Sequence, residues 1–260
     1  MYQLILTIVL VLTVPPQGGP TFDVAVVKPN PQRQNANRSG CRGIDTKLTP
    51  ADPRNSIPIG RCVFIGARLD SAISFAHEFP TQWMRGGPQW IRTDGYDIEA
   101  TAENPASTSE NQLRQMLKAL LEDRFKLKYR REIQEVPGFA LTIDRGGPKL
   151  QKATGAEEPF VLTTVLPNAT LVATRTSMAT FAKEMLSKAN LCLGAPLSPV
   201  VDRTGLEGVY AFRMAWTLCR GEVVPGSDNT IPYALKDLGL KLEAAKVPQE
   251  ILFIDNVERP

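Results

Sequence analysis

Alternating and helical runs of apolar residues divide the chain into secondary-structure elements. Apolar residues alternate with polar ones from Tyr96 to Ala100, and residues 210–214 repeat this spacing of two, which is typical of half-buried strands. Apolar positions recur at spacings of three and four in residues 69–79, 109–124 and 177–186, which predicts amphipathic helices. A shorter helix is expected after Thr230, with Pro232 in its first turn.

The predicted elements occur in the same order in both halves of the chain: strand, strand, helix, strand, helix and hairpin. Each half opens with an apolar strand that ends in Pro-Asn, FDVAVVKPN from Phe22 and FVLTTVLPN from Phe160. Each half closes on a similar stretch, DRFKLKYRREIQEVPGFALTID at residues 123–144 and GLKLEAAKVPQEILFID at residues 239–255, where a hairpin is expected. The sequence therefore predicts an α+β fold made of two tandem, internally duplicated modules.

The predicted modules are residues 21–145 and 160–260, joined by a polar linker at residues 146–159 that is rich in Gly and Pro. Residues 1–20 are interpreted as a signal peptide or N-terminal anchor. The apolar run from Tyr2 to Val14 is shorter than the roughly 20 residues that span a bilayer, but it suits a secretory signal. No basic residue precedes the run and no A-x-A site follows it, so a buried strand or helix is the alternative. We expect an exported protein, periplasmic or secreted.

Cysteine usage agrees with export. The chain has four cysteines, and because each predicted module holds two, the pairs Cys41–Cys62 and Cys192–Cys219 are favoured as disulfides. Four unrelated buried thiols are the alternative. No C-x-x-C motif is present, so zinc and thioredoxin-type chemistry have no support.

Motifs for catalysis or cofactor binding are missing from the sequence. His77 is the only histidine, which excludes metal sites that need two, and we interpret it as a helix-end residue. There is no G-x-S-x-G elbow, phosphate-binding G-x-x-x-x-G-K loop or G-x-G-x-x-G motif. Thirty basic residues against 27 acidic ones leave a net charge of +3, too small to indicate a nucleic-acid partner. We therefore predict no catalytic residue, metal, cofactor or specific nucleic acid.

A pair of carboxylates leaves one enzymatic alternative open. Asp97 and Glu99 lie on one side of a predicted strand, at a backbone spacing of about 6.6 Å that glycoside hydrolases could use. Charges on the wet face of a strand are the simpler interpretation. The second half carries Ala211 and Arg213 at the equivalent positions, so the repeat does not reproduce the pair.

Two short segments are candidate ligand or partner surfaces. The segment FPTQWMRGGPQW places Trp83 and Trp90 in an apolar loop, which either packs under the first helix, as we favour, or presents a binding patch. Lys126, Lys128 and Arg130 share one side of a strand and could meet an anionic polymer. A charged edge strand that resists aggregation is the commoner reason for such a stripe.

Several segments together resemble a known family. They are FDVAVVKPN, GYDIEA, LLEDRFKLKYRRE, GGPKL, VVDRTGLEGVYAF and LGLKLEAAKVPQEILFIDNVERP. They resemble a large paralogous family of exported proteins of unknown function from soil acidobacteria, sometimes joined to an antibiotic-sensing membrane metallopeptidase. The resemblance covers residues 21–260 and implies no activity or site. The strand-helix-strand core is also similar to small modules at the periplasmic ends of secretins and TonB-dependent receptors.

From the sequence we expect a non-catalytic binding, sensor or assembly module of the cell envelope. Its partner would be an envelope protein or a glycan, and it would touch a membrane only through an uncleaved N-terminal segment. The alternative is an envelope glycan hydrolase with paired carboxylates.

Overall fold

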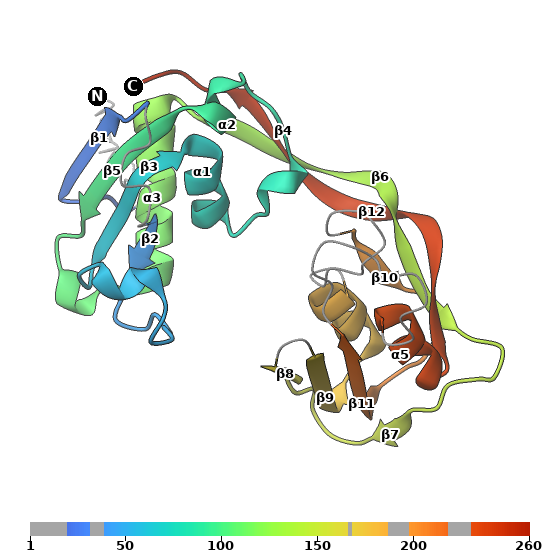
Figure 1. Ribbon diagram of the computed structural model, residues 1–260. Helices are drawn as coiled ribbons and strands as arrows, with labels where there is room; N and C mark the ends of the chain where they lie inside the picture. The colour runs from blue at the N-terminus through green and yellow to red at the C-terminus, as the bar shows by residue number, and fades with distance from the viewer. Residues whose placement is uncertain (1–19, 32–38, 166–167, 187–197, 218–229) are drawn as a thin grey trace, which may run out of the picture. The chain divides into compact units, whose positions relative to one another are not determined.

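A computed structural model describes residues 20–31, 39–165, 168–186, 198–217 and 230–260 (Figure 1). The chain forms two compact units, each built from helices and strands, which confirms the α+β class. Unit 1 extends to Glu132 and takes up the chain again from Ile251 to Pro260. Unit 2 comprises Ile133–Glu250. The sequence placed the division later, at the linker 146–159.

Unit 1 contains an antiparallel sheet with strand order β1-β5-β3-β2. Its elements are β1 (Val24–Pro29), β2 (Ser39–Arg42), η1 (Pro53–Ser56), β3 (Arg61–Arg68), α1 (Leu69–His77), η2 (Thr81–Trp83), β4 (Met84–Gly86), α2 (Trp90–Thr93), β5 (Gly95–Thr101), η3 (Pro105–Ser107) and α3 (Glu110–Phe125). The core includes Phe64, Ile98 and Leu117, each about 1% exposed or less. Burial of such a side chain contributes about 2 kcal/mol.

The helix α3 begins and ends where the sequence predicts. The Ser109 hydroxyl accepts a hydrogen bond from the Gln112 N–H at 3.2 Å, and the Gln112 side chain accepts from the Ser109 N–H at 2.8 Å. This capping box satisfies two amide groups that the first helical turn leaves without partners. Lys126 follows the helix in the left-handed conformation, with φ 50°. The helix therefore has a defined start and end, and it buries Leu113, Leu117 and Leu121 against the sheet.

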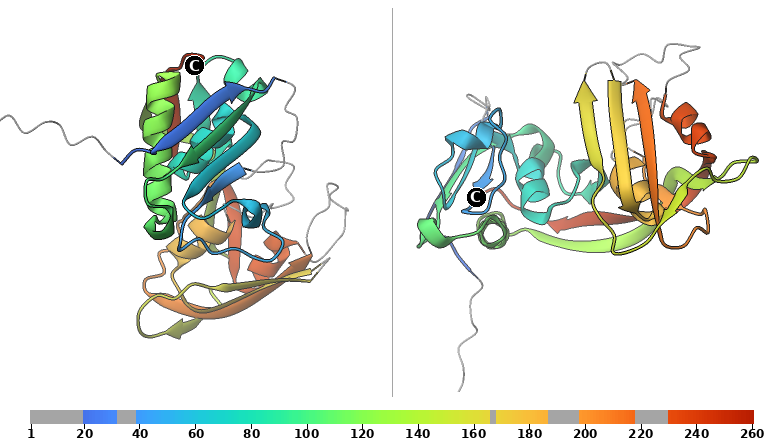
Figure 2. Two further views of the ribbon diagram at one scale, coloured as in Figure 1. Left: turned by 90° about the vertical axis from the view of Figure 1, so that its left-hand side faces the viewer. Right: turned by 90° about the horizontal axis from the view of Figure 1, so that it is seen from below.

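Unit 2 has a second antiparallel sheet, with strand order β7-β11-β9-β8. Its elements are β7 (Gln151–Ala153), β8 (Val161–Val165), β9 (Asn168–Thr176), α4 (Met178–Thr180), η4 (Phe181–Leu186), β10 (Val200–Asp202), β11 (Val209–Thr217) and α5 (Ile231–Asp237). The right view of Figure 2 shows β8, β9 and β11 side by side, coloured yellow to orange. Helices α4 and α5 contribute Met178 and Leu235 to a core of buried residues. The predicted linker thus supplies a polar edge strand, β7.

The two closing stretches do not form separate hairpins, so this prediction is wrong. Each is one long strand, β6 (Lys128–Ile143) and β12 (Leu240–Asn256), and the two pair with each other in a sheet of order β10-β6-β12-β4. The Val-Pro steps at Pro137 and Pro248 suggested turns. Both the φ of proline and the preference of the preceding residue are compatible with an extended chain, so each strand continues through its proline.

The two opening strands that the sequence equated occupy different places in their sheets. The sequence equated β1 with β8, yet β1 pairs with β5, whereas β8 pairs with β9. In both sheets the unit's first strand lies beside its fourth, and its second beside its third. By this order β7 is the counterpart of β1, and β8 is the counterpart of β2.

The disulfide Cys41–Cys62 is confirmed. The two cysteines face each other across β2 and β3, with Cα atoms 4.0 Å apart, and both are fully buried. Cys192 and Cys219 lie outside the described residues. The bond closes a loop over a sequence separation of 21 residues.

Replacement of Cys41 and Cys62 by alanine should lower the free energy of unfolding by about 3 kcal/mol, because the open loop adds entropy to the unfolded chain. Urea unfolding of the double variant beside the parent protein would measure this loss. A midpoint equal to that of the parent would show that the loop is held closed by other contacts.

Candidate functional site

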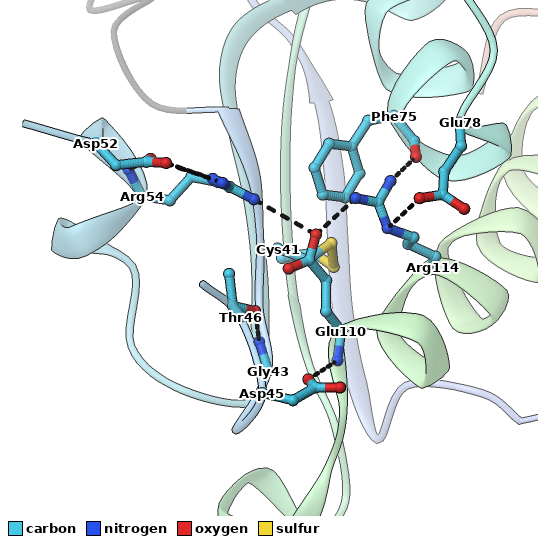
Figure 3. Close-up of polar contacts among 11 residues, drawn as sticks. Cys41, Gly43, Asp45, Thr46, Asp52, Arg54, Phe75, Glu78, Glu110 and Arg114 are labelled. Atoms are coloured by element: carbon cyan, nitrogen blue, oxygen red, sulfur yellow. Dashed lines mark hydrogen bonds and ion pairs between the residues drawn. A yellow bond between two sulfur atoms is a disulfide. The ribbon is translucent and has the colours of Figure 1, made fainter. Parts of the chain in front are cut away.

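A chain of charged side chains connects the loop after β2 to the helices α1 and α3 (Figure 3). Arg54 Nη2 lies 2.8 Å from Asp52 Oδ2, and Arg54 Nη1 lies 3.4 Å from Glu110 Oε1. Arg114 Nη2 lies 2.6 Å from the same Glu110 oxygen, and Arg114 Nε lies 3.8 Å from Glu78 Oε1. Acidic and basic groups alternate along this network, so each charge has an opposite neighbour.

The backbone around Glu110 explains why the loop meets the helix at this point. The Glu110 N–H, one of the free amides of the first helical turn, donates to Asp45 Oδ1 at 2.8 Å. The Ile44 N–H donates to the Thr108 carbonyl at 3.0 Å. Gly43 lies so close that a Cβ there would collide with the Glu110 nitrogen. A glycine is therefore required where the loop crosses the start of α3.

Arg114 is the best-packed member of the network. Its guanidinium carbon lies 4.1 Å from the centre of the Phe75 ring, and Nη1 donates to the Phe75 carbonyl at the end of α1. Only 17% of the Arg114 side chain is exposed, and 16% of Glu110. Arginine is suited to this role because its planar fork can stack on a ring and hydrogen-bond to several acceptors at once.

The pKa shifts within the network indicate that its role is to hold the loop in place. The hydrogen bond from Arg54 lowers the pKa of Asp52, and the same bond raises the pKa of Arg54. Both shifts stabilise the charged forms, whereas a general acid or base needs a pKa near the working pH. Through these paired charges the network ties the loop after β2 to the helices α1 and α3.

The carboxylates Asp97 and Glu99 have different surroundings. Asp97 Oδ1 accepts the Gly66 N–H at 2.8 Å and the Asn30 amide at 2.9 Å, where β3 has an irregular register against β5. Glu99 is exposed on the same strand. A carboxylate that satisfies a backbone amide at a bulge has a structural role. The structure therefore gives the hydrolase alternative no support at this pair.

His77 is the most unusual titratable group that the structure describes. His77 is only 6% exposed, and neither ring nitrogen has a hydrogen-bond partner among the described residues. Its ring meets Tyr129 edge to face, with centroids 4.5 Å apart. Burial, with smaller effects from Lys118 and Arg131, lowers the pKa of His77 to about 4. The ring is therefore neutral at physiological pH and packs as an apolar group at the end of α1.

Trp83 and Trp90 are half-buried against the core of unit 1. Trp90 contacts Tyr96, with ring centres 6.0 Å apart, and Arg259 stacks over it at 5.2 Å. Between the two tryptophans, Met84 pairs with Leu252 of β12 and is buried. The two rings therefore pack against the core of unit 1, and a ligand surface at them stays a prediction.

The prediction that Lys126, Lys128 and Arg130 share one strand is wrong for Lys126, which follows α3 as its C-cap, whereas Lys128 and Arg130 lie in β6. Arg130 forms ion pairs with Glu132, at 2.7 Å, and with Asp255. Lys126 lies 3.7 Å from Asp123, and Lys128 is exposed. Because two of the three cations are paired, their attraction for an anionic polymer is reduced, and such a surface stays a prediction.

The described ranges contain neither a cluster of metal-ligand side chains nor a helix suited to cross a membrane. No three His, Cys, Asp or Glu side chains gather there in the way that metal ligands do. No helix in these ranges has both the length and the apolar character that a membrane span requires. The apolar run from Tyr2 to Val14 lies outside the described residues.

Comparison with known proteins gives a family. Residues 70–257 match the family described as "Protein of unknown function (DUF3738)". This chain belongs to the DUF3738 family. No curated protein and no solved structure matches the chain. The match begins inside α1, so the strands β1, β2 and β3 of the DUF3738 protein precede it. An acidobacterial origin and a paralogous family stay predictions.

Sequence reasoning missed the open sheet edges of the DUF3738 protein. The edge strand β8 is exposed at all five residues, and three of these are large and apolar: Val161 at 63%, Leu162 at 51% and Val165 at 71% exposure. Val172 of the neighbouring strand is 41% exposed. The strand VLTTV has no charge, proline or glycine, the residues that usually protect an edge. The lack of these protective residues can be seen in the sequence, but only the sheet order shows that β8 is an edge strand.

Replacement of Arg114 by alanine should lower the free energy of unfolding by about 2 kcal/mol, because it removes the stacking on Phe75 and leaves Glu110 with a weaker partner. The matched control is Arg124→Ala on the same helix, whose exposed ion pair should contribute well under about 1 kcal/mol. Chemical denaturation of both variants would test this. Equal losses of unfolding free energy in the two variants would contradict the interpretation that Arg114 holds the loop and the two helices together.

The pKa of His77 also predicts how stability depends on pH. Because the unfolded histidine titrates near 6.5 and the folded one near 4, protons bind preferentially to the unfolded chain as the pH falls between these values. The contribution is complete above pH 6.5 and declines by up to about 3 kcal/mol towards pH 4. As the pH is lowered from 7 to 5, the denaturation midpoint of the parent protein should fall, and that of His77→Leu should change less. Parallel curves would contradict this account.

Proposed function

We propose that this DUF3738 protein is a non-catalytic binding module of the cell envelope, with a role in sensing or assembly. The observation that carries the proposal is the open edge β8. A strand edge presents unpaired N–H and C=O groups, and an extended segment of another protein can add to it as a further strand. The exposed Val161, Leu162 and Val165 would supply apolar contact to such a strand.

Export is part of the proposal. Its supports are the apolar run near the N-terminus and the disulfide Cys41–Cys62, because disulfides persist in oxidising compartments and are rare in the cytosol. The periplasm or the cell exterior meets this requirement.

Internal duplication is also proposed. Its support is the order of the strands, first-fourth-third-second, in both four-stranded sheets. A helix follows the third strand in each unit, α1 after β3 and α4 after β9, and another follows the fourth, α3 after β5 and α5 after β11. Two binding units from one ancestor would each expose sheet edges, and these could diverge to take different partners.

The hydrolase alternative lacks a supporting observation. A glycosidase needs a carboxyl group with a raised pKa to act as the acid. Hydrogen bonding lowers the pKa of the described carboxyl groups Asp52, Glu157 and Glu243, with Arg54, the Ser177 backbone and Lys241 as the main donors.

The test is crosslinking in the native envelope, followed by mass spectrometry and measurement of affinity with the purified partner. We expect the double variant Leu162→Lys with Val165→Lys to bind at least about tenfold more weakly, because the charges would have to be desolvated in the new sheet. Both residues are mostly exposed, so the fold should be retained.

A matched control is Tyr233→Lys, which changes an exposed apolar residue of α5, 49% exposed, away from the edge. It should bind as the parent does. Equal binding by the β8 variant would show that this edge is not the contact. Cleavage of an envelope glycan by the purified protein would overturn the non-catalytic proposal.

A further inference from the structure

A second open edge lies in unit 1, along β1. This strand is at one end of its sheet, and among the described residues its only strand partner is β5. The Asn30 N–H donates to the Gly95 carbonyl at 2.8 Å, and hydrogen-bonded pairs alternate along an antiparallel ladder. The backbone groups of Val24 and Val26 therefore point to β5, and those of Ala25 and Val27 point to the free edge. Pro29, which has no N–H, ends this row.

A hollow of about 220 Å³ lies between the start of β1 and the second half of α3. The left view of Figure 2 shows β1 (blue) beside α3 (green). The apolar lining of this hollow, the β1–α3 groove, comprises Phe22, Ala25, Met116, Ala119 and Leu120. The volume is below the roughly 300–1,000 Å³ that is usual for small-molecule sites. It suits one large apolar side chain.

Acidic groups predominate around the groove. Asp23, Asp123 and Arg124 also line it, and the Arg124 guanidinium lies 3.3 Å from the Asp123 carboxylate. A second, more polar hollow adjoins it, because Thr21 and Met116 line both, and this hollow contains Glu103. Together the two linings hold three carboxylates and one guanidinium, and because Asp123 is paired with both Arg124 and Lys126, the net negative charge comes from Asp23 and Glu103. The charge is complementary to a basic ligand.

We propose that the β1–α3 groove binds an extended basic segment of another protein, which adds to β1 as a strand. The added strand would pair with the outward backbone groups of Ala25 and Val27. One apolar side chain would enter the groove opposite Ala25. This inference goes beyond the binding role proposed for β8, since it concerns a different unit and a different edge.

The register determines the sequence that such a segment should have. Asp23 precedes β1, and its side chain lines the groove together with that of Ala25, two residues further along the chain. A Lys or Arg opposite Asp23 would therefore be separated by one residue from the apolar side chain in the groove. The intervening residue would face the side of Val24 and Val26, which are 57% and 47% exposed, and should be β-branched or apolar.

The experiment is selection of phage-displayed random dodecapeptides on the purified full chain, with counter-selection on the variant Ala25→Pro. Proline at position 25 removes an N–H that points to the free edge, so the pairing of β1 with β5 should remain intact. We expect enriched peptides to carry Lys or Arg two positions from Leu, Met, Ile or Phe. Their synthetic versions should bind Ala25→Pro at least about tenfold more weakly than the parent.

Two helix variants make a matched pair. Ala119→Phe fills the groove and should reduce peptide binding, whereas Gln115→Phe, at an exposed position outside the groove, should not. Thermal unfolding of all variants would verify that they fold. Asp23→Lys combined with Glu103→Lys should remove the preference for basic peptides.

Several results would overturn the proposal. They are the absence of any peptide enriched over Ala25→Pro, selection of acidic peptides, and equal binding by Ala119→Phe and Gln115→Phe. Two further results would assign the edge to another occupant. These are a concentration-dependent dimer that Ala25→Pro abolishes, or peptide binding that appears only after residues 1–19 are deleted. Because the β8 double variant should bind the selected peptides normally, failure here is distinguishable from failure of the envelope partner.

Discussion

The pairing of β6 with β12 is the interaction on which the architecture depends. The chain leaves unit 1 along β6 and returns along β12, and each strand contributes residues to both units. In unit 1, Leu252 and Ile254 of β12 belong to the buried core beside residues of α1 and β5. In unit 2, Leu141 of β6 and Leu240 of β12 are fully buried. The core of unit 2 therefore uses both strands, and the core of unit 1 uses β12 with Tyr129 of β6 packed against it.

This arrangement constrains folding. Unit 1 cannot complete its core until the last ten residues of the chain are present, although the rest of it lies before Ile133. Contacts so distant in sequence close slowly, because the loop entropy is lost before the contacts form. Local features offset part of this difficulty. The capping box at Ser109 starts α3 without help from distant residues, and the Cys41–Cys62 bond and the Arg54–Glu110–Arg114 network hold the loop after β2.

The surface follows from how each sheet is covered. In unit 1 the described helices bury one side of the sheet, and β1 has an edge beside α3 with which no described strand pairs. In unit 2 the edge strand β8 is exposed along its whole length. Most described charged groups of the Arg54–Glu110–Arg114 network are paired, and His77 is neutral in an apolar site. The groups that could contact a partner are therefore mainly the backbone groups of the strand edges and the exposed apolar side chains. This is the physical basis of the binding role proposed above.

The sequence by itself determined the elements whose signals are local. The helix at residues 110–125, its Ser109 cap and the alternating strand around Tyr96 follow from side-chain periodicity and capping chemistry. The pairing of Cys41 with Cys62 followed from their proximity in one half of the chain. Tertiary structure decided the partners of the strands. Whether the Val-Pro steps turn or continue, whether β8 lies beside β9 or β11, and which edges stay open all depend on contacts between residues far apart in sequence, which periodicity does not encode. The burial of His77 and the groove beside β1 depend on the same contacts, so they too became visible only in the fold.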